Sequence, residues 1–167
     1  MDFSKWPKDV LVRYLEFLIH NYRVMDAFWF INLENDYDLN EACRVNEKVW
    51  GKVAQLAARD LKKRFNVQEG GLEGFVKVKK LHPWSLLIGY QYEVEPDQVL
   101  IKVPSCATQE SRLQYGLEEY PCKAMHMAEF VNFAQEVDPR IKVECLFAPP
   151  DEHPPDMFCT WRFTLEE

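Results

Sequence analysis

The amino-acid sequence predicts an α+β fold, in which N-terminal helices are followed by a four-stranded antiparallel sheet with a helix inserted between its two hairpins. Three observations lead to this prediction. From Pro7 to about Asn66, apolar residues recur every three or four positions, the period of an amphipathic helix. After Trp84 the period changes to β-rich runs bounded by turn residues. These runs form two pairs, and helical segments lie between the pairs.

The length of 167 residues predicts one domain, 1–167, with a helical half at about 7–83 and a sheet half at about 84–167. A chain of this size buries roughly two-thirds of its unfolded surface, which is enough for one core. No composition change marks a linker, and no fixed-period repeat is present.

The first two helices are predicted from their apolar stripes. The first begins at Pro7 and ends near Leu33. Its apolar residues share one helical face: Val10, Leu11, Tyr14, Leu15, Leu18, Tyr22, Met25 and Trp29. The second begins at a capping box formed by Asp38 and Glu41. Its stripe continues to the end of the helix near Asn66: Ala42, Val49, Val53, Leu56 and Phe65.

The rest of the chain alternates between short helices and strands. A third helix around 75–81 ends at His82-Pro83, because the residue before a proline disfavours helical geometry. Two strands, 86–94 and 99–103, are joined by a turn at 95–98 that contains Pro96. The remaining predicted elements are listed in chain order: helices 108–115 and 123–137, strand 141–147, a proline-rich loop 148–156, and strand 157–165.

Composition and charge narrow the partners and the compartment. The net charge of −7 with scattered basic residues argues against a nucleic-acid partner. The N-terminal segment lacks the pattern of a signal peptide, and no apolar run is long enough to span a membrane, so we predict no membrane partner and a cytoplasmic location. In a reducing compartment, five cysteines are more typical of buried thiols, metal ligands or a reactive thiolate than of disulfides.

Four cysteines form a candidate zinc site: Cys106, Cys122, Cys145 and Cys159. If the last two strands pair around a turn centred near Glu152, Cys145 lies opposite Cys159. Zinc accepts four thiolate or imidazole ligands, and His153 could replace one cysteine. No Cys-x-x-Cys pair is present, so unliganded core thiols remain an alternative. Cys43 lies on the second helical stripe and is assigned to the core.

Cys122 is also a candidate nucleophile. It opens a predicted helix and precedes Lys123, and both features would lower the pKa of its thiol. His126, four residues later, shares a helical face with Cys122 and could serve as a general base. A Cys-His pair at this spacing can equally be incidental. No phosphate-binding glycine loop, serine nucleophile elbow or His-Glu-x-x-His helix occurs.

A ligand site is suggested by polar residues within apolar helical stripes. Asp26 lies in an apolar and aromatic segment and needs a partner if it is buried. Asn46, on the second stripe, could form a hydrogen bond with it, or both could anchor a ligand. Trp29, Phe30 and Trp50 would line an aromatic pocket. The same aromatic residues would also suit an ordinary core.

An ordered series of motifs resembles a known family. The motifs of the second half are Pro104-Ser105-Cys106-Ala107-Thr108-Gln109, Arg112, Gly116-Leu117-Glu118-Glu119, Pro121-Cys122-Lys123, Asp138-Pro139-Arg140-Ile141, Cys145, Pro149-Pro150-Asp151, His153-Pro154 and Cys159-Thr160-Trp161-Arg162-Phe163. Those of the helical half are Asp26-Ala27-Phe28-Trp29-Phe30, Glu34, Ala42, Asn46 and Trp50. Together they resemble an uncharacterised prokaryotic family related to the L-2-amino-thiazoline-4-carboxylic acid hydrolase family.

More distantly, the element order and the late cysteines resemble the 4-vinyl reductase domain, whose fold is shared with trafficking-complex subunits. In phenol-sensing members of that group, late cysteines hold zinc beside a small aromatic ligand. This resemblance implies zinc ligation by Cys122, Cys145 and Cys159, with Cys106 as the candidate fourth ligand. The related prokaryotic family often has a cysteine where this chain has Ala148, so that position contributes no ligand here.

Three functions follow from these observations. The leading hypothesis is a domain that binds an unidentified small molecule in an aromatic pocket and holds a structural zinc. The second is a hydrolase of a small cyclic amide or thiazoline-type substrate, acting through Cys122 or a metal-bound water. The third is a protein-interaction subunit, which predicts an exposed apolar patch. A homodimer is consistent with all three.

Overall fold

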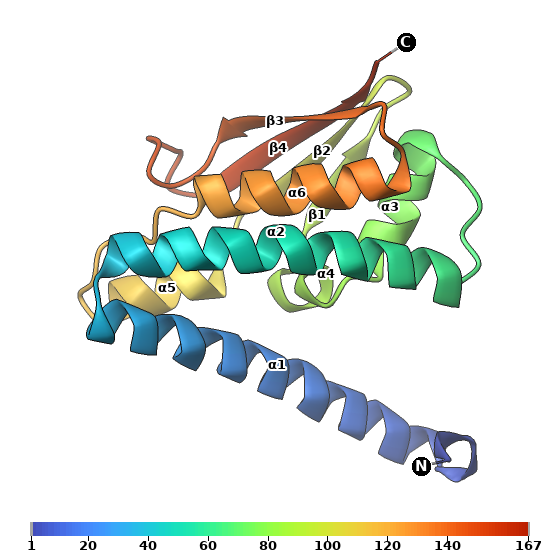
Figure 1. Ribbon diagram of the computed structural model, residues 1–167, viewed down its shortest axis with the longest axis horizontal. Coiled ribbons are helices and arrows are strands. Elements are labelled where there is room, and N and C mark those ends of the chain that lie inside the picture. The colour runs from blue at the N-terminus through green and yellow to red at the C-terminus, as the bar shows by residue number, and fades with distance from the viewer. Residues whose placement is uncertain (1, 167) are drawn as a thin grey trace. The chain divides into compact units, whose positions relative to one another are not determined.

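The computed structural model describes residues 2–166 and has the predicted α+β fold (Figure 1). A 3-10 helix at Phe3–Lys5 precedes the first long helix. The remaining elements are α1 (Lys8–Asp36), α2 (Leu39–Arg64), α3 (Gly71–Lys80), α4 (Pro83–Ile88), β1 (Gln91–Val94), β2 (Gln98–Val103), α5 (Ala107–Gln114), α6 (Lys123–Val137), β3 (Ile141–Phe147) and β4 (Cys159–Leu165).

The described residues group into two compact units, one that ends at Ala42 and one that begins at Cys43. The boundary falls inside α2, so the first unit consists of α1 with its flanking segments. The prediction of one domain over 1–167 stays a prediction. No helix among residues 2–166 is both long and apolar enough to cross a membrane.

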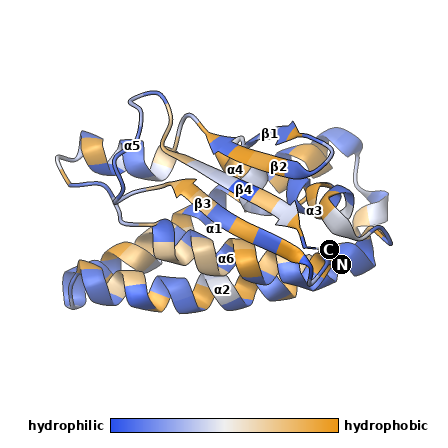
Figure 2. Ribbon diagram, turned by 90° about the horizontal axis from the view of Figure 1, so that it is seen from above, coloured by the Kyte–Doolittle hydropathy of each residue, from blue (hydrophilic) through white to orange (hydrophobic). Residues whose placement is uncertain are grey.

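The second unit contains one antiparallel sheet with the strand order β1-β2-β4-β3. Helix α6 packs against β3, and α3 packs against β4 (Figure 1). Alternate strand residues point to opposite faces, and hydrophobic and hydrophilic residues alternate along β3 (Figure 2). Buried residues contributed by the helices and the sheet form the core: Phe75, Val78, Val99, Ile101, Phe130, Phe133, Trp161 and Phe163.

The sequence prediction of a strand over 86–94 is wrong for its first part. Residues Pro83–Ile88 form α4, and only Gln91–Val94 are strand. Pro83 occupies the first turn of α4, where a missing N–H costs nothing. Gly89, at φ 70°, ends the helix in the left-handed conformation that glycine adopts without strain. The predicted turn into β2 is confirmed, because the Glu95 N–H donates to the Gln98 carbonyl at 2.9 Å.

The start of α2 is confirmed and its predicted stripe is partly wrong. The Asp38 carboxylate accepts a hydrogen bond from the Glu41 N–H at 2.8 Å, as a capping residue does. Val49, Leu56 and Phe65 are exposed instead of buried. The buried residues of this helix are mostly small: Ala42, Asn46, Trp50, Gly51, Ala54 and Ala58.

Small residues on α2 allow close approach to α6, which lies beside it (Figure 1). A methyl group built at Gly51 would lie 3.4 Å from the Ala128 Cβ, which is a tight van der Waals contact. The sequence prediction selected large apolar residues for the buried face. The structure places small residues there because the separation of two packed helices depends on the side chains at their contact.

The last two strands pair antiparallel as predicted, but in another register. Cys145 lies opposite Trp161, and Cys159 pairs with Val103 of β2. The register also shifts between Cys145 and Phe147. The inferred juxtaposition of Cys145 and Cys159 across the two strands is therefore wrong. The observed register places Trp161 and Phe163 in the core, and burial of one face is what specifies strand register.

Candidate functional site

An ion pair lies in the interior of the second unit. The Lys79 Nζ of α3 donates to the Glu129 Oε1 of α6 at 2.6 Å, and the two side chains are 0% and 2% exposed. Lysine and glutamate are almost never fully buried unless they are paired. Burial lowers the pKa of Lys79, while Glu129 acts in the opposite direction. Neither residue was predicted as part of a site from the sequence.

Aromatic rings surround the buried ammonium group. Lys79 Nζ lies 4.6 Å from the ring centre of Phe133, 4.7 Å from that of Phe130 and 5.7 Å from that of Tyr90. The faces of these rings carry partial negative charge and attract a cation. The ammonium therefore has one carboxylate and several ring contacts in place of water.

Glu129 also binds His126, one turn earlier on α6. The His126 Nδ1 lies 2.9 Å from the Glu129 Oε2, and the imidazole stacks on Phe130. Burial opposes ionisation of Glu129, yet Lys79 and His126 together hold the pKa of its carboxyl well below the ordinary value. Because His126 is partly exposed, this chain of polar groups extends from the buried Lys79 towards solvent.

His82 completes the interior cluster that also contains Lys79, Glu129 and His126. Its imidazole is buried, lies edge-on to Phe133 and, within the described part of the chain, has no hydrogen-bond partner at Nδ1. Burial, with a further contribution from the charge of Lys79, lowers the pKa of His82 to about 3. His82 is therefore neutral near pH 7. Its spacing in the sequence contains no sign of this environment.

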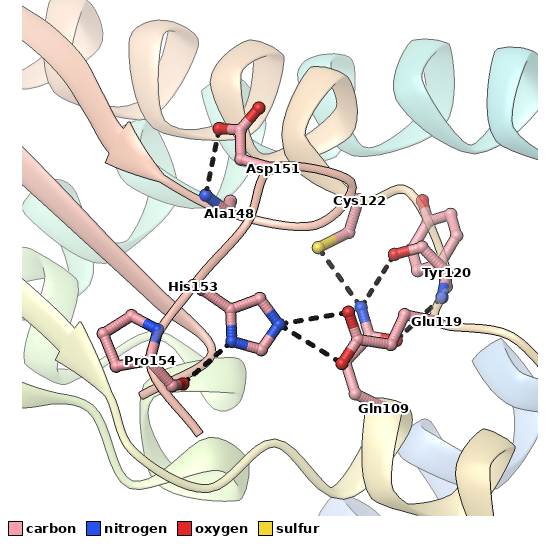
Figure 3. Close-up of polar contacts among 8 residues, drawn as sticks. All are labelled: Gln109, Glu119, Tyr120, Cys122, Ala148, Asp151, His153 and Pro154. Atoms are coloured by element: carbon pink, nitrogen blue, oxygen red, sulfur yellow. Dashed lines mark hydrogen bonds and ion pairs between the residues drawn. The ribbon is translucent and has the colours of Figure 1, made fainter. Parts of the chain in front are cut away.

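Gln109 holds the segment that leads to the predicted nucleophile (Figure 3). Its side-chain amide donates to the Tyr120 carbonyl at 2.7 Å and lies 3.5 Å from the Cys122 Sγ. Its carbonyl oxygen accepts from the Tyr120 N–H at 2.8 Å. Gln109 is itself buried, so it fixes the backbone immediately before α6.

The predicted activation of Cys122 is wrong in direction. Burial raises the pKa of its thiol well above the ordinary value, and the nearby Cys159 and Cys106 contribute in the same direction. Lys123 does not offset this, because its ammonium pairs with Asp151 at 2.7 Å. His126, the proposed base, binds Glu129 instead. A thiolate is the nucleophilic form, so this arrangement does not favour nucleophilic catalysis.

Burial acts in the same direction on the other three cysteines of the predicted zinc site. Burial raises the pKa of Cys159 to about 12 and that of Cys145 to about 11, and it also raises the pKa of Cys106. Among residues 2–166 no group of three or more His, Cys, Asp or Glu side chains could hold a metal ion.

The described residues therefore show no arrangement of side chains that fits zinc, and we assign no role to a metal ion. His153, the alternative ligand, lies 3.1 Å from a Glu119 oxygen (Figure 3). The zinc prediction stays a prediction, and elemental analysis of protein purified under reducing conditions is the direct check.

The predicted ligand residues lie in both units. Asp26, Trp29 and Phe30 belong to α1, where Phe30 is buried and Trp29 is partly exposed. In the second unit, the buried Asn46 donates to the Tyr120 hydroxyl at 2.9 Å, and Trp50 lies edge-on to Trp84. The predicted hydrogen bond between Asp26 and Asn46 would join the two units and stays a prediction.

Helix α1 presents an apolar seam, defined by residues Leu11, Leu15, Leu18, Tyr22, Met25 and Trp29. These positions are separated alternately by four and three residues, which is the spacing of a coiled-coil contact line. Leu15, Leu18, Met25 and Trp29 are 55%, 42%, 64% and 37% exposed. This face was predicted from the periodicity of its apolar residues, but an amphipathic helix would normally bury it.

Comparisons with known proteins agree with the fold. A protein-family model described as "Family of unknown function (DUF6125)" matches residues 4–165. No curated protein matches the chain. A crystal structure of trafficking protein particle complex subunit 3 from Naegleria fowleri, covalently bound to palmitic acid, is similar at a TM-score of 0.55 and 12% identity. The match covers 91% of this chain and 97% of that subunit. The predicted trafficking-subunit fold is thereby confirmed, whereas the relation to thiazoline hydrolases stays a prediction.

Proposed function

The chain belongs to the DUF6125 family of unknown function, and we propose that it acts as a protein-interaction subunit that binds its partner through the apolar seam of α1. The exposed seam is the observation that carries this proposal. An exposed apolar patch is the feature expected of a protein-interaction subunit, the third of the three functions predicted from the sequence. The second unit has its own core, and no residue of the seam belongs to that core.

The seam differs from the scattered apolar residues that every protein surface carries. Single exposed hydrophobic side chains are normal, but a contiguous apolar patch is typical of an interaction site. From Leu11 to Trp29 the seam extends for about 27 Å, at 1.5 Å per helical residue. It is flanked by further exposed apolar residues, among them Val12, Phe17 and Phe28. This length and spacing suit another helix better than a small molecule.

The similarity to a subunit of a trafficking complex supports the same function. That protein is named as one subunit of a multi-subunit particle. At 12% identity the likeness concerns the fold alone. A fold used for assembly elsewhere is nevertheless consistent with an exposed helical seam in this chain.

The seam is tested by placing charges in it. The double variant Leu18→Glu/Met25→Glu is expected to weaken association at least about tenfold, because two carboxylates would be desolvated at the helix contact. Light scattering of the purified protein over a dilution series measures the mass of the assembly. Any second protein that co-purifies in a fixed ratio, called a companion below, is identified. Circular dichroism checks that the variant keeps its helix content.

His20→Glu/Arg23→Glu is the matched control, because it places two carboxylates on the same helix away from the seam. This control should associate as the wild type does. If the wild type is a single chain without a companion at all concentrations, or if both double variants behave alike, the proposal is wrong.

Small-molecule binding in the interior is a second candidate function. Trp161 lies 5.1 Å from Phe130 and 6.3 Å from His126, between ring centres. Its indole N–H is buried and has only a weak contact with the Cys159 thiol, and the Nδ1 of His82 is buried without a hydrogen-bond partner in the described residues. Such atoms normally have a partner, and an apolar pocket with a few polar groups is typical of ligand sites. The palmitic acid bound to the trafficking subunit suggests a ligand with an apolar tail and a polar head.

Palmitic acid is therefore the probe for this second function. It is expected to raise the melting temperature of the wild type by a few degrees, because a ligand that binds only the folded state stabilises it. The increase should be smaller in Trp161→Phe, which lacks the N–H, and unchanged in Trp6→Phe, which alters a tryptophan of the N-terminal unit. A wild type whose melting temperature does not respond would contradict this candidate.

A further inference from the structure

We infer that the partner of the α1 seam is a second copy of this chain, with the two α1 helices antiparallel. The inference rests on the proposed function and adds the identity and orientation of the partner. It is carried by three observations: the symmetry of the seam, the sizes of its side chains, and the charges at its ends.

The seam is symmetric about residue 20. Leu11 and Trp29 are each nine positions from this centre, Leu15 and Met25 five, and Leu18 and Tyr22 two. When a second copy lies antiparallel and is centred on this point, Leu11 of one copy faces Trp29 of the other. In the same way Leu15 faces Met25, and Leu18 faces Tyr22. A two-fold axis requires that residue i contacts j while j contacts i, and the spacing satisfies this condition.

The flanking residues obey the same symmetry. Val12 and Phe28 each lie eight positions from residue 20, and they are 44% and 62% exposed. In the antiparallel arrangement each Val12 would lie at the same level as the Phe28 of the second copy, on the opposite flank of the seam. The exposed apolar surface of α1 therefore extends to both flanks of the seam, at levels that the same symmetry relates.

Side-chain sizes distinguish antiparallel from parallel pairing. In the antiparallel register Trp29 packs against Leu11, and Tyr22 packs against Leu18, so each large ring meets a smaller aliphatic side chain. Parallel pairing would place Trp29 against Trp29 and leucines against leucines, which makes the helix separation uneven along the seam. Close packing requires facing side chains to fill the space at a constant helix separation.

Charges at the two ends of α1 favour the same orientation. At the N-terminal end Asp2 pairs with Lys5 and Asp9 pairs with Arg13, and Lys8 gives this end a net positive charge. Glu34 and Asp36 lie at the C-terminal end. Antiparallel pairing brings the basic end of one copy beside the acidic end of the other. Parallel pairing would bring like charges together, which disfavours it.

Cross-linking between introduced cysteines tests the orientation. Chains that carry Leu15→Cys are mixed with chains that carry Met25→Cys, under oxidising conditions, and covalent dimers are counted on non-reducing gels. The mixture is expected to yield covalent dimers well above the wild-type background. Each single variant alone should remain at background, because in the antiparallel pair its two thiols are separated by about 15 Å along the helix axis.

Wild type under the same conditions is the baseline, since the chain has five cysteines of its own. Strong cross-linking of Leu15→Cys with itself would overturn the antiparallel orientation. If the chain associates with itself through the seam but the mixture yields no covalent dimers, the inferred register is wrong. If the chain associates only with a different protein, the partner is not a second copy. Neither of these two results contradicts the proposed function. A wild type that is a single chain without any companion would overturn both.

Discussion

Replacing Glu129 by glutamine is expected to lower the free energy of unfolding by about 3–5 kcal/mol, because it leaves the buried ammonium of Lys79 without its counter-charge. The two side chains are 0% and 2% exposed, so solvent cannot supply the missing interaction. Chemical denaturation with urea, at constant pH and salt, measures the change. The surrounding rings offer only a part of the stabilisation that the carboxylate provides.

Two variants separate the effect of the charge from that of the altered side chain. Lys79→Met/Glu129→Gln removes the uncompensated charge and fills the space between the rings with a flexible apolar side chain, so it should recover much of the lost stability. Glu136→Gln, which breaks the surface pair with Arg59, is the matched control and should be far milder. Equal destabilisation by Glu129→Gln and Glu136→Gln would show that burial of the interior pair does not matter.

Stability is expected to fall by about 2–3 kcal/mol as the pH is lowered from 6.5 to 4.5, through His82. The unfolded chain binds a proton at this imidazole below about 6.5, whereas burial lowers the pKa of His82 to about 3 in the folded state. Over this interval the unfolded state therefore holds more protons, and each pH unit adds about 1.4 kcal/mol in its favour. Lys79 and Glu129 are the charged groups that act on His82, and the pKa of Glu129 lies well below this window.

The slope of stability against pH is measured by urea denaturation at several values between 4.5 and 6.5. His82→Phe should flatten this slope, whatever its effect on stability at pH 7. His20→Gln removes an exposed histidine and serves as the control, which should keep the wild-type slope. If His82→Phe and the wild type have the same slope, the imidazole is not kept neutral by burial.

Local signals predicted most of the secondary structure. The predicted range 123–137 of the sixth helix agrees with α6, and the turn between β1 and β2 formed where Pro96 suggested. The segment 86–94 was assigned to a strand because it is apolar and β-rich. In the structure, a short helix begins at Pro83 and is ended by Gly89. These two residues at the ends of the helix, and not the apolar residues between them, determined the local structure.

The interior cluster had only a faint signal in the sequence. Lys79 follows Phe75 by four positions, and Glu129 directly precedes Phe130, so each charge occurs among core residues of a helix. Nothing in the sequence pairs them, because they are 50 residues apart. Of the residues predicted from the sequence, only His126, in the predicted pair with Cys122, belongs to this cluster.

By itself, the sequence determined the order of helices and strands apart from α4, the α+β class and the apolar face of α1, because these depend on interactions between residues close in the chain. Only the tertiary structure decided that Lys79 and Glu129 pair, that Cys159 lies beside β2 instead of opposite Cys145, and that Leu15, Leu18, Met25 and Trp29 of α1 are exposed. Burial and the packing of distant segments control all three, and they set both the pKa values of buried groups and the surface left for a partner.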